Sequence, residues 1–209
     1  GSDVYAPATI RPLPKSNKLI WYSERSGWAH LYLYDLKTGT LIRQLTSGDW
    51  LVRDILGVDE AHRQAFVSIA GRAKDKNPYY QEVARVDLDT GAMKILSASN
   101  DDHQVLNPGS LTDINALTYV FSGGDPEGLQ GVSPSGDYFI ETLTTADKPS
   151  RTVIRDRDGR LVTMVEEADA SRIPSSWRWP TPVRMVAADG KTESDGLVFL
   201  PSDYDPQKK

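Results

Sequence analysis

The residues whose types and spacing come nearest to catalysis are a serine and two glycines in one short segment. Gly131-Val132-Ser133-Pro134-Ser135-Gly136 approaches the G-x-S-x-G pattern, in which the glycines permit the strained turn that presents a nucleophilic serine. The second glycine comes one position late, and Pro134 lacks the N–H that would help to form an oxyanion hole. We therefore interpret Ser133 as part of a turn and not as a nucleophile.

Histidines are the second class of residue that could do chemistry. We place His30 in a strand, His62 in a turn and His103 in a loop, and no Asp or Glu pattern marks any of them as a general base. A metal site built from all three would require the fold to bring them together. The sequence has no cysteine, which excludes disulfides, thiolate nucleophiles and Cys-based zinc sites. We expect no catalytic, cofactor-binding or metal-binding residue in this chain.

Two groups of carboxylates have structural interpretations. Asp87-Leu88-Asp89-Thr90-Gly91 alternates carboxylates as a calcium loop does, but no bidentate Glu follows at the required spacing, so we predict a turn. Glu166-Glu167 follows a predicted strand at 161–165, and we expect this pair in a solvated loop.

The elements that must position these residues are strands, with almost no helix. Residues 18–24 are rich in β-forming types, and 29–36 place large residues on both sides of the alternation, which indicates a strand buried on both faces. A turn follows at 37–40, and a further strand is expected at 41–45. This succession of strands and short turns is typical of an all-β fold.

A unit of strand, acidic turn ending in glycine, and strand occurs three times. The turns lie at 34–39, 86–91 and 155–159, and further strands precede them at 19–23, 65–70 and 138–142. The successive intervals are about 50 and about 70 residues, and a period near 50 with four short strands is typical of β-propeller blades. The longer interval predicts an insertion at 107–128, a stretch rich in Gly, Pro, Asp and Asn.

The resulting prediction is an all-β partial β-propeller with about three four-stranded antiparallel blades. We expect the blades at about 8–48, 49–100 and 101–170, within a region spanning 1–175, and a linker with a β-hairpin at 176–209.

The segment 21–35 carries a family resemblance. It reads W-Y-S-E-R-S-G-W-A-H-L-Y-L-Y-D, which resembles the W-x-S-E-R-x-G-x-x-H-L-Y-L-Y-D blade signature of dipeptidyl peptidase IV and its bacterial relatives, members of the prolyl oligopeptidase superfamily of serine peptidases. Residues 45–50, L-T-S-G-D-W, resemble the L-T-x-G-x-W step into the next blade of those proteins. Residues 187–193 and 196–201 resemble the hairpin that leads into their peptidase domain.

The resemblance implies a propeller that caps an α/β-hydrolase domain, which carries a Ser, Asp, His triad and removes Xaa-Pro or Xaa-Ala dipeptides. On this basis the chain holds the closing blades and the first hairpin of an absent peptidase domain, is inactive by itself, and shapes and gates the active site. The family's substrate-binding glutamates follow a D-W-x-Y-E-E type of sequence. Here Asp49-Trp50 is followed by Leu51-Val52-Arg53-Asp54, so we assign no substrate-binding residue.

The resemblance also implies partners and a compartment. The parent would act on peptide substrates, form a homodimer and be periplasmic or extracellular. We expect Gly1-Ser2 to be a tag-cleavage remnant and this segment to self-associate through exposed blade edges.

The composition limits which other classes of function and partner are possible. The net charge is −5 and acidic and basic residues are interspersed, which argues against a nucleic-acid partner. No run approaches the roughly 20 apolar residues of a membrane span. Two alternatives stay open: a non-enzymatic propeller that binds proteins or glycans, and a propeller glycosidase, which would need convergent carboxylates.

Aromatic residues allow two interpretations as well. They could form a carbohydrate platform, but we favour packing between neighbouring blades, since aromatic side chains dominate strand cores; this group comprises Trp21, Tyr22, Trp28, Tyr32 and Tyr34. We expect Trp177 and Trp179 to dock the segment that leaves the propeller.

Overall fold

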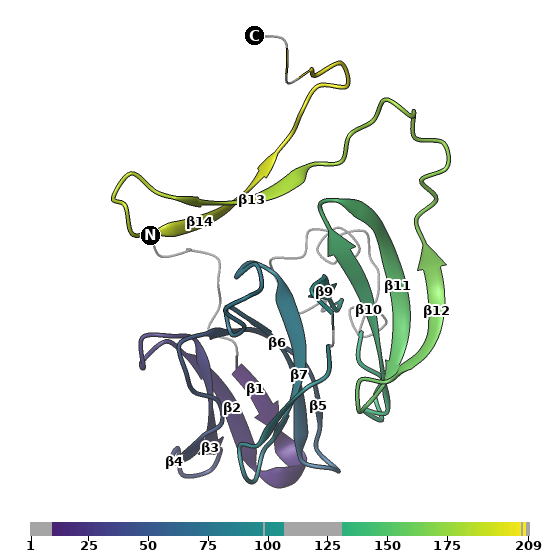
Figure 1. The fold of residues 1–209 in the computed structure, drawn as a ribbon. Helices are drawn as coiled ribbons and strands as arrows, with labels where there is room; N and C mark the ends of the chain where they lie inside the picture. Colours follow the sequence, from purple (N-terminus) through teal and green to yellow (C-terminus); the bar gives the residue numbers. More distant parts are fainter. Residues whose placement is uncertain (1–9, 98, 107–130, 206, 208–209) are drawn as a thin grey trace, which may run out of the picture.

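The fold consists of strands that follow one another in antiparallel sheets. A computed structural model describes residues 10–97, 99–106, 131–205 and 207. In these residues the strands are accompanied by one short 3-10 helix, Pro14–Ser16. They form three four-stranded sheets and one two-stranded hairpin (Figure 1). The predicted all-β class, with about three four-stranded blades and a C-terminal hairpin, is therefore confirmed.

Each four-stranded sheet is built from strands that are consecutive in the chain. The first sheet contains β1 (Ile10–Leu13), β2 (Lys18–Ser23), β3 (His30–Asp35) and β4 (Leu41–Gln44). The second contains β5 (Leu51–Asp59), β6 (Gln64–Ala70), β7 (Gln81–Asp87) and β8 (Met93–Ile95). The third contains β9 (Asp102–Gln104), β10 (Tyr138–Thr145), β11 (Lys148–Asp156) and β12 (Leu161–Glu167). The hairpin consists of β13 (Thr181–Val186) and β14 (Glu193–Val198).

Two local predictions need correction. His103 lies in strand β9 and not in a loop, and Glu166 and Glu167 are the last residues of β12 and not a loop beyond it. In both cases pairing with a neighbouring strand, which no apolar pattern indicates, places the residue in a ladder: His103 pairs with Leu143, and Glu167 pairs with Arg151. The insertion predicted at 107–128 lies outside the described residues, and the division into regions 1–175 and 176–209 stays a prediction.

The acidic turns explain why the strands reverse where they do. Asp35 Oδ1 accepts hydrogen bonds from the backbone N–H groups of Lys37 (3.0 Å) and Thr38 (2.8 Å), and Gly39 adopts a φ of 70°. Asp87 repeats this arrangement with the N–H groups of Asp89 and Thr90. An aspartate that bonds its own turn, followed by a glycine at positive φ, ends one strand and starts the next.

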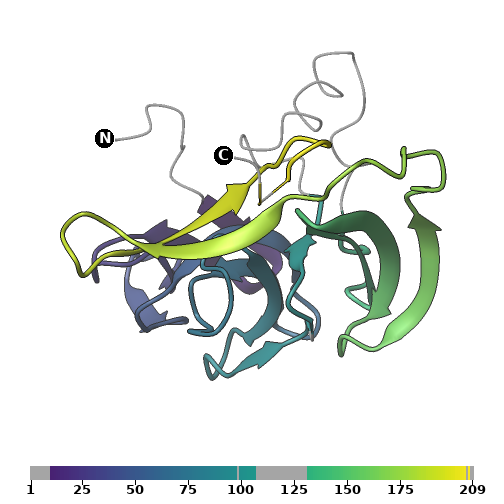
Figure 2. The same cartoon turned by 45° about the horizontal axis from the view of Figure 1, so that its top comes forward.

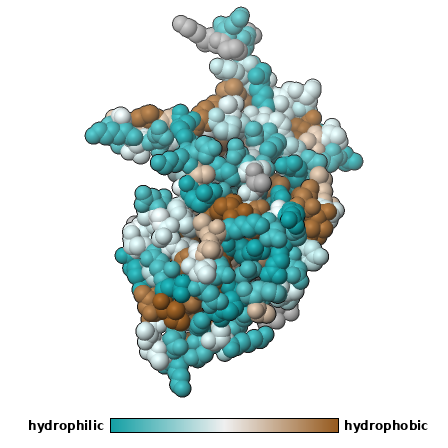
Figure 3. All heavy atoms as spheres, turned by 60° about the horizontal axis from the view of Figure 1, so that its bottom comes forward, coloured by the Kyte–Doolittle hydropathy of each residue, from teal (hydrophilic) through white to brown (hydrophobic). Residues whose placement is uncertain are grey.

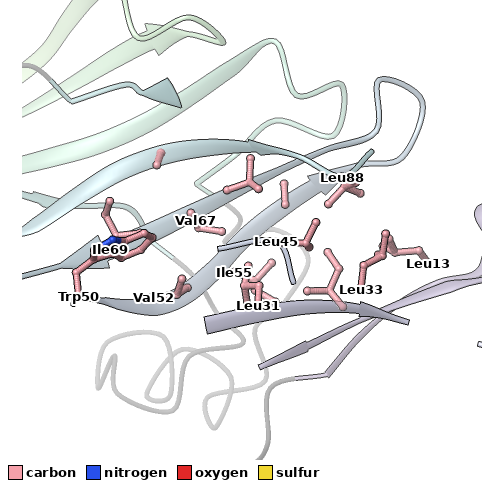
Figure 4. Packing of buried hydrophobic residues seen from close by; sticks show 14 residues of the cluster. Leu13, Leu31, Leu33, Leu45, Trp50, Val52, Ile55, Val67, Ile69 and Leu88 are labelled. Atoms are coloured by element: carbon pink, nitrogen blue, oxygen red, sulfur yellow. The ribbon is translucent and has the colours of Figure 1, made fainter. Parts of the chain in front are cut away.

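Hydrophobic packing joins the first two sheets. In the first sheet, Ile20 lies opposite Leu33 and Tyr22 lies opposite Leu31, so these four side chains share one face. That face packs against the second sheet around Val67 and Val86 in a continuous buried cluster (Figure 4). Because the cluster draws residues from both sheets, neither face would be covered without the other.

The second and third sheets are joined by a smaller cluster and by charged residues. Phe66 of β6 and Phe139 of β10 pack with ring centroids 6.4 Å apart. Arg85 of β7 donates to the carbonyl oxygen of Arg157 at 2.5 Å and to Asp158 at 3.1 Å. The interface between the second and third sheets is therefore more polar than the interface between the first and second sheets.

Glycines allow the close approach of each sheet to the one before it. A Cβ atom placed on Gly91 would lie 3.2 Å from the carbonyl oxygen of Leu45, which ends the first sheet. On Gly159 the same atom would overlap the backbone of Leu96 at the end of the second sheet. Gly39 holds the equivalent position in the first sheet, where a Cβ would meet nothing within 4 Å. Gly91 and Gly159 thus act as contact points between consecutive sheets, whereas Gly39 does not.

The hairpin of β13 and β14 lies across one end of the first two sheets, as two views show (Figures 1 and 2). Its contact with the body of the molecule includes a hydrogen bond from Arg184 to the carbonyl oxygen of Lys76, at 3.4 Å. Among the described residues, no helix has the length and apolar character needed to cross a membrane.

Candidate functional site

A cleft of about 410 Å³ lies where the hairpin meets the loops of the second and third sheets. The second sheet contributes the loop between β6 and β7, the third contributes the end of β10 and the turn after it, and the hairpin contributes β14. The lining residues are Asn77, Tyr79, Tyr80, Thr144, Thr145, Ala146, Asp195, Gly196 and Leu197. Three parts of the chain that are distant in sequence thus form one concave surface.

The chemistry of this cleft suits binding. Tyr79 and Tyr80 supply aromatic rings, and the ring of Tyr79 is exposed. Asp195 is the carboxylate in the lining, and its Oδ1 accepts a hydrogen bond from Arg184 at 3.2 Å. The described lining contains neither a histidine nor a cysteine, so it offers no nucleophile with an adjacent base. Aromatic rings, hydroxyls and a paired carboxylate fit a surface that holds a peptide segment.

Charged residues fix the loop that carries the two tyrosines. Glu82 of β7 is buried, and it accepts hydrogen bonds from Arg72 Nη2 at 3.1 Å and from Nε at 3.2 Å. Lys76 Nζ lies 3.5 Å from the same carboxylate and donates to the carbonyl oxygen of Ser99 at 2.5 Å. Since Arg184 of the hairpin bonds to Lys76, the loop connects the hairpin to the second sheet.

A serine, a histidine and a glutamate meet at strands β9 and β10 of the third sheet. Ser99 Oγ lies 3.2 Å from His103 Nε2, and His103 Nδ1 lies 2.8 Å from Glu141 Oε2. This order of atoms matches a hydrolytic triad in outline. His103 and Glu141 are both buried, so the fold places a complete acid–base pair out of solvent.

The hydrogen bonds around Ser99 oppose a nucleophilic role. Its hydroxyl donates to Asp101 Oδ2 at 2.5 Å, which directs the proton away from His103. The ring nitrogen of His103 also lies 3.3 Å from the carbonyl oxygen of Ser99. Arg155 Nε donates to the other oxygen of Glu141. We therefore interpret this group, Ser99, Asp101, His103, Glu141 and Arg155, as a structural cluster, and call it the buried polar cluster.

Electrostatics in the buried polar cluster keep its carboxylates ionised. Burial raises the pKa of Glu141, but the hydrogen bonds and charges of His103 and Arg155 outweigh it, so the pKa lies below its ordinary value. Burial also raises the pKa of Asp101, and here Lys148 at 2.7 Å, Ser99 and Arg151 reverse the effect. Both groups stabilise the fold through their charged forms.

The structure separates the residues that the sequence singled out. Ser133 lies in the turn before β10, where its Oγ accepts a hydrogen bond from the N–H of Tyr138 at 3.1 Å and lies 3.3 Å from Ser135 Oγ. His30 is buried, 3.0 Å from both Thr46 Oγ1 and the carbonyl oxygen of Gly48. Glu166 and Glu167 are exposed. In the part of the chain that the structure describes, no group of three or more His, Asp and Glu side chains is arranged to hold a metal ion.

Two of the histidines have a carboxylate partner in the structure, although no sequence pattern marked any histidine as a general base. His62 Nδ1 lies 2.6 Å from Asp59 Oδ2, and His103 pairs with Glu141. The Asp59 pair is local, three residues apart, and its D-x-x-H spacing in a turn was a usable signal. The Glu141 pair joins residues 38 apart in the sequence, and only the register of β9 and β10 brings them together.

The aromatic residues divide between two faces of the first sheet. Tyr22 packs against the cluster between the first two sheets. Trp21 pairs with Tyr32 across the strands, which places both on the opposite face, where Arg25 lies 4.2 Å from the ring centroid of Tyr32. Tyr32 is only 3% exposed, so its ring is not free to stack on a sugar. Trp177 and Trp179 contact each other edge to face and are both exposed.

Three comparisons with known proteins point to the same family. A family model described as the dipeptidyl peptidase IV (DPP IV) N-terminal region matches residues 4–150. A protein assigned as dipeptidyl peptidase 4 from Aspergillus flavus is 42% identical over 60 residues, which are 27% of this chain and 8% of that protein. A crystal structure assigned as a dipeptidyl aminopeptidase IV from Bacteroides ovatus ATCC 8483 matches with a TM-score of 0.70 and 21% identity, over 96% of this chain and 27% of that one. The chain thus spans a small part of each relative, and the structural likeness supports the fold.

Proposed function

The chain belongs to the family of the dipeptidyl peptidase IV N-terminal region, and we propose that it is the non-catalytic propeller portion of a serine exopeptidase that removes Xaa-Pro or Xaa-Ala dipeptides. In this role the segment shapes the entrance to an active site carried elsewhere in a longer protein. We further propose a periplasmic or extracellular location, which rests on the family alone.

The observation that carries this proposal is the composition of the cleft under the hairpin. Its described lining combines tyrosine rings, hydroxyls and one carboxylate that is paired with Arg184. These groups can hold a peptide but cannot cleave one, because no lining residue pairs a nucleophile with a base. A binding surface with no hydrolytic groups is what a substrate-guiding segment requires.

The hairpin is the part of this surface that is best placed to act as a gate. Its strands β13 and β14 pair along their whole length with each other, from Thr181 with Val198 to Val186 with Glu193. Its attachment to the loop at Lys76 is a hydrogen bond from one side chain, Arg184. An element that is rigid in itself and lightly attached can change the opening of the cleft as a unit.

The test uses the longer gene product that contains this segment, with two substrates of different size. We expect hydrolysis of Gly-Pro-p-nitroanilide and of a long peptide with proline at its second position. Arg184→Ala should change the ratio of the two kcat/KM values by about threefold or more, because the gate affects the large substrate most. The matched control is Arg172→Ala, which alters an exposed arginine between β12 and β13.

Each outcome separates the two parts of the proposal. No hydrolysis of either substrate by the longer protein rejects the peptidase, and a protein- or glycan-binding propeller then becomes the better description. Hydrolysis with an unchanged ratio in Arg184→Ala rejects the gating role and retains the peptidase.

A further inference from the structure

The ring of His103 is a titratable group that lies inside the molecule. Hydrophilic residues dominate the molecular face shown in Figure 3, where water stabilises charge. The side chain of His103 is instead 0% exposed, and its strand, β9, lies between β10 and β7 (Figure 1). Its protonation state therefore depends on the groups that the fold places against its two ring nitrogens.

The Nδ1 atom of His103 faces a group that can only accept a hydrogen bond. Glu141 Oε2 lies 2.8 Å from it, and Arg155 Nε donates to the other oxygen of the same carboxylate. Glu141 is ionised, so it has no proton to give. Nδ1 must therefore carry the proton of this hydrogen bond.

The Nε2 atom of His103 also faces acceptors. The carbonyl oxygen of Ser99 lies 3.3 Å from it, and Ser99 Oγ lies 3.2 Å from it. The hydroxyl has one proton and gives it to Asp101 Oδ2 at 2.5 Å, so it presents a lone pair to the ring. A neutral imidazole has one bare nitrogen, which would oppose these oxygen lone pairs at a cost in free energy. The geometry thus requires two ring protons and, with them, a positive charge.

His30 shows the opposite arrangement at a position that is equally buried. Its Nε2 lies 3.0 Å from the carbonyl oxygen of Gly48, and its Nδ1 lies 3.0 Å from Thr46 Oγ1. Thr46 Oγ1 accepts a hydrogen bond from the N–H of Leu31 and keeps its own proton to donate to Nδ1. One proton, on Nε2, satisfies this ring, so we expect His30 to be neutral.

The buried charges linked to His103 by hydrogen bonds and ion pairs balance when its ring is positive. Three carboxylate side chains in this network are at most 5% exposed: Glu82, Asp101 and Glu141. Two cationic side chains are 12% exposed: Lys76 and Arg155. The other cations of the described network are at least 35% exposed, so water screens their charges; these are Arg72, Lys148 and Arg151. A proton on His103 supplies the third buried positive charge, and buried ions are stable only when each has a partner.

Ser99 connects His103 to the loop that carries the tyrosines of the cleft. The carbonyl oxygen of Ser99 lies within reach of His103 Nε2 and also accepts a hydrogen bond from Lys76 Nζ at 2.5 Å. Lys76 belongs to the loop at 71–80, which contributes both cleft tyrosines. The segment 99–101, which we call the strap, therefore joins the third sheet to this loop.

We propose that His103 is a buried imidazolium that acts as a proton-dependent latch: its two ring protons hold the strap against the third sheet, and loss of the Nε2 proton at alkaline pH releases the strap. Nδ1 keeps its proton in the neutral form, because a bare Nδ1 would face the Glu141 carboxylate. Nε2 then becomes an acceptor, and the Ser99 hydroxyl turns away from Asp101 to bond it. The strap rearranges, which loosens the anchor of the cleft loop at the Ser99 carbonyl. This proposal is independent of the peptidase role.

The first experiment detects the ring protons of the three histidines in the 209-residue chain by nitrogen-15 NMR. His103→Gln and His30→Gln assign the signals, because each removes one set. We expect two ring N–H groups on His103 and one on His30 at about pH 7.5, where an ordinary histidine is mostly neutral. A single ring proton on His103 under these conditions would overturn the proposal.

The second experiment measures backbone hydrogen exchange of the wild-type chain from about pH 7 to about pH 10. Once NMR shows that the Nε2 proton is lost, exchange in the loop 71–80, corrected for the intrinsic effect of pH, should accelerate at least about fivefold. The first sheet, residues 10–44, should remain protected.

The two glutamine variants provide a matched comparison in the same experiment. His103→Gln removes the charge, so the loop should already exchange at the faster rate at about pH 7. His30→Gln makes the same change at an equally buried histidine of the first sheet and should leave exchange of the loop as in the wild type. If His103→Gln does not fold, the wild-type pH series decides by itself.

Two further results would contradict the latch. One is a ring that loses its Nε2 proton while exchange of the loop stays unchanged. The other is a ring that keeps both protons until the whole protein unfolds, because the strap then has no release of its own.

Discussion

Glu141 lies at the centre of the buried polar cluster of the third sheet. Its carboxylate is buried, and it accepts hydrogen bonds from His103 Nδ1 at 2.8 Å and from Arg155 Nε. Burying charges costs free energy, and the cost is offset only while every member of the group has its partner. Residues from β9, β10 and β11 meet in this cluster, so it fixes the register of the sheet.

Replacing Glu141 by glutamine should therefore destabilise the protein strongly. Glu141→Gln leaves Arg155 and His103 without a counter-charge inside the fold, and we expect the free energy of unfolding to fall by about 3 kcal/mol. Urea denaturation followed by tryptophan fluorescence measures this change. Asp137→Asn is the control, because Asp137 is half-exposed and lies 3.4 Å from Arg157, so its loss should cost less than about 1 kcal/mol. Equal effects of the two variants would contradict the role of the cluster.

The same carboxylates predict how stability depends on pH. The pKa of Glu141 lies below its ordinary value of 4.5, and those of Asp59 and Asp101 lie below 3.8. A carboxyl whose pKa is lower in the folded state stabilises the fold above its unfolded pKa and loses this contribution as the pH falls. We expect the free energy of unfolding to be steady from about pH 7 to about pH 5 and to decrease below about pH 4.5. Thermal denaturation across this range measures it, and Glu141→Gln should show a shallower decrease.

At the scale of elements, the turn glycines determine how closely consecutive sheets pack. Gly159 and Gly39 occupy equivalent positions and have similar φ values of 86° and 70°. They differ in surroundings, since a Cβ on Gly159 would overlap the backbone of Leu96, whereas one on Gly39 would contact nothing. Comparing the same substitution at Gly39 and Gly159 therefore distinguishes the cost of backbone strain from the cost of disturbed packing between the sheets.

Alanine substitutions at these two positions test the contact. Both Gly39→Ala and Gly159→Ala should lower the free energy of unfolding by about 1 kcal/mol, because alanine disfavours the left-handed backbone conformation. Gly159→Ala should lose about 2 kcal/mol more, because the second and third sheets must separate to admit the methyl group. Urea denaturation of the two variants gives the difference directly. If both lose the same amount, the sheets do not meet at Gly159.

At the scale of the whole molecule, the described parts of the sheets, the hairpin and the cleft expose no serine that has both a histidine and a carboxylate in line. Among the described residues, Ser99 lies in line with a histidine and a carboxylate, and its proton is directed to Asp101. We expect the 209-residue chain to show no turnover of Gly-Pro-p-nitroanilide above a buffer blank. Turnover that persists after stringent purification and disappears in Ser99→Ala would show that the buried polar cluster is catalytic.

The family and the class of fold were predictable because their signals are local. The aspartates of the turns bond to N–H groups two or three residues away, so D-x-x-T-G predicts a reversal wherever it occurs. The repeat of these turns gave the succession of four-stranded sheets. The residues 21–35 carried the family resemblance, which the family match confirmed.

The contacts that define the sites depend on tertiary structure. His103 meets Glu141 across 38 residues, and Arg157 meets Asp59 across 98. Neither partner changes the sequence pattern around the other, so these two contacts could not be predicted from the sequence. The cleft under the hairpin likewise arises from how the sheets and the hairpin are placed. Local backbone chemistry thus determined where the strands and turns lie, and strand register and sheet packing decided which side chains meet.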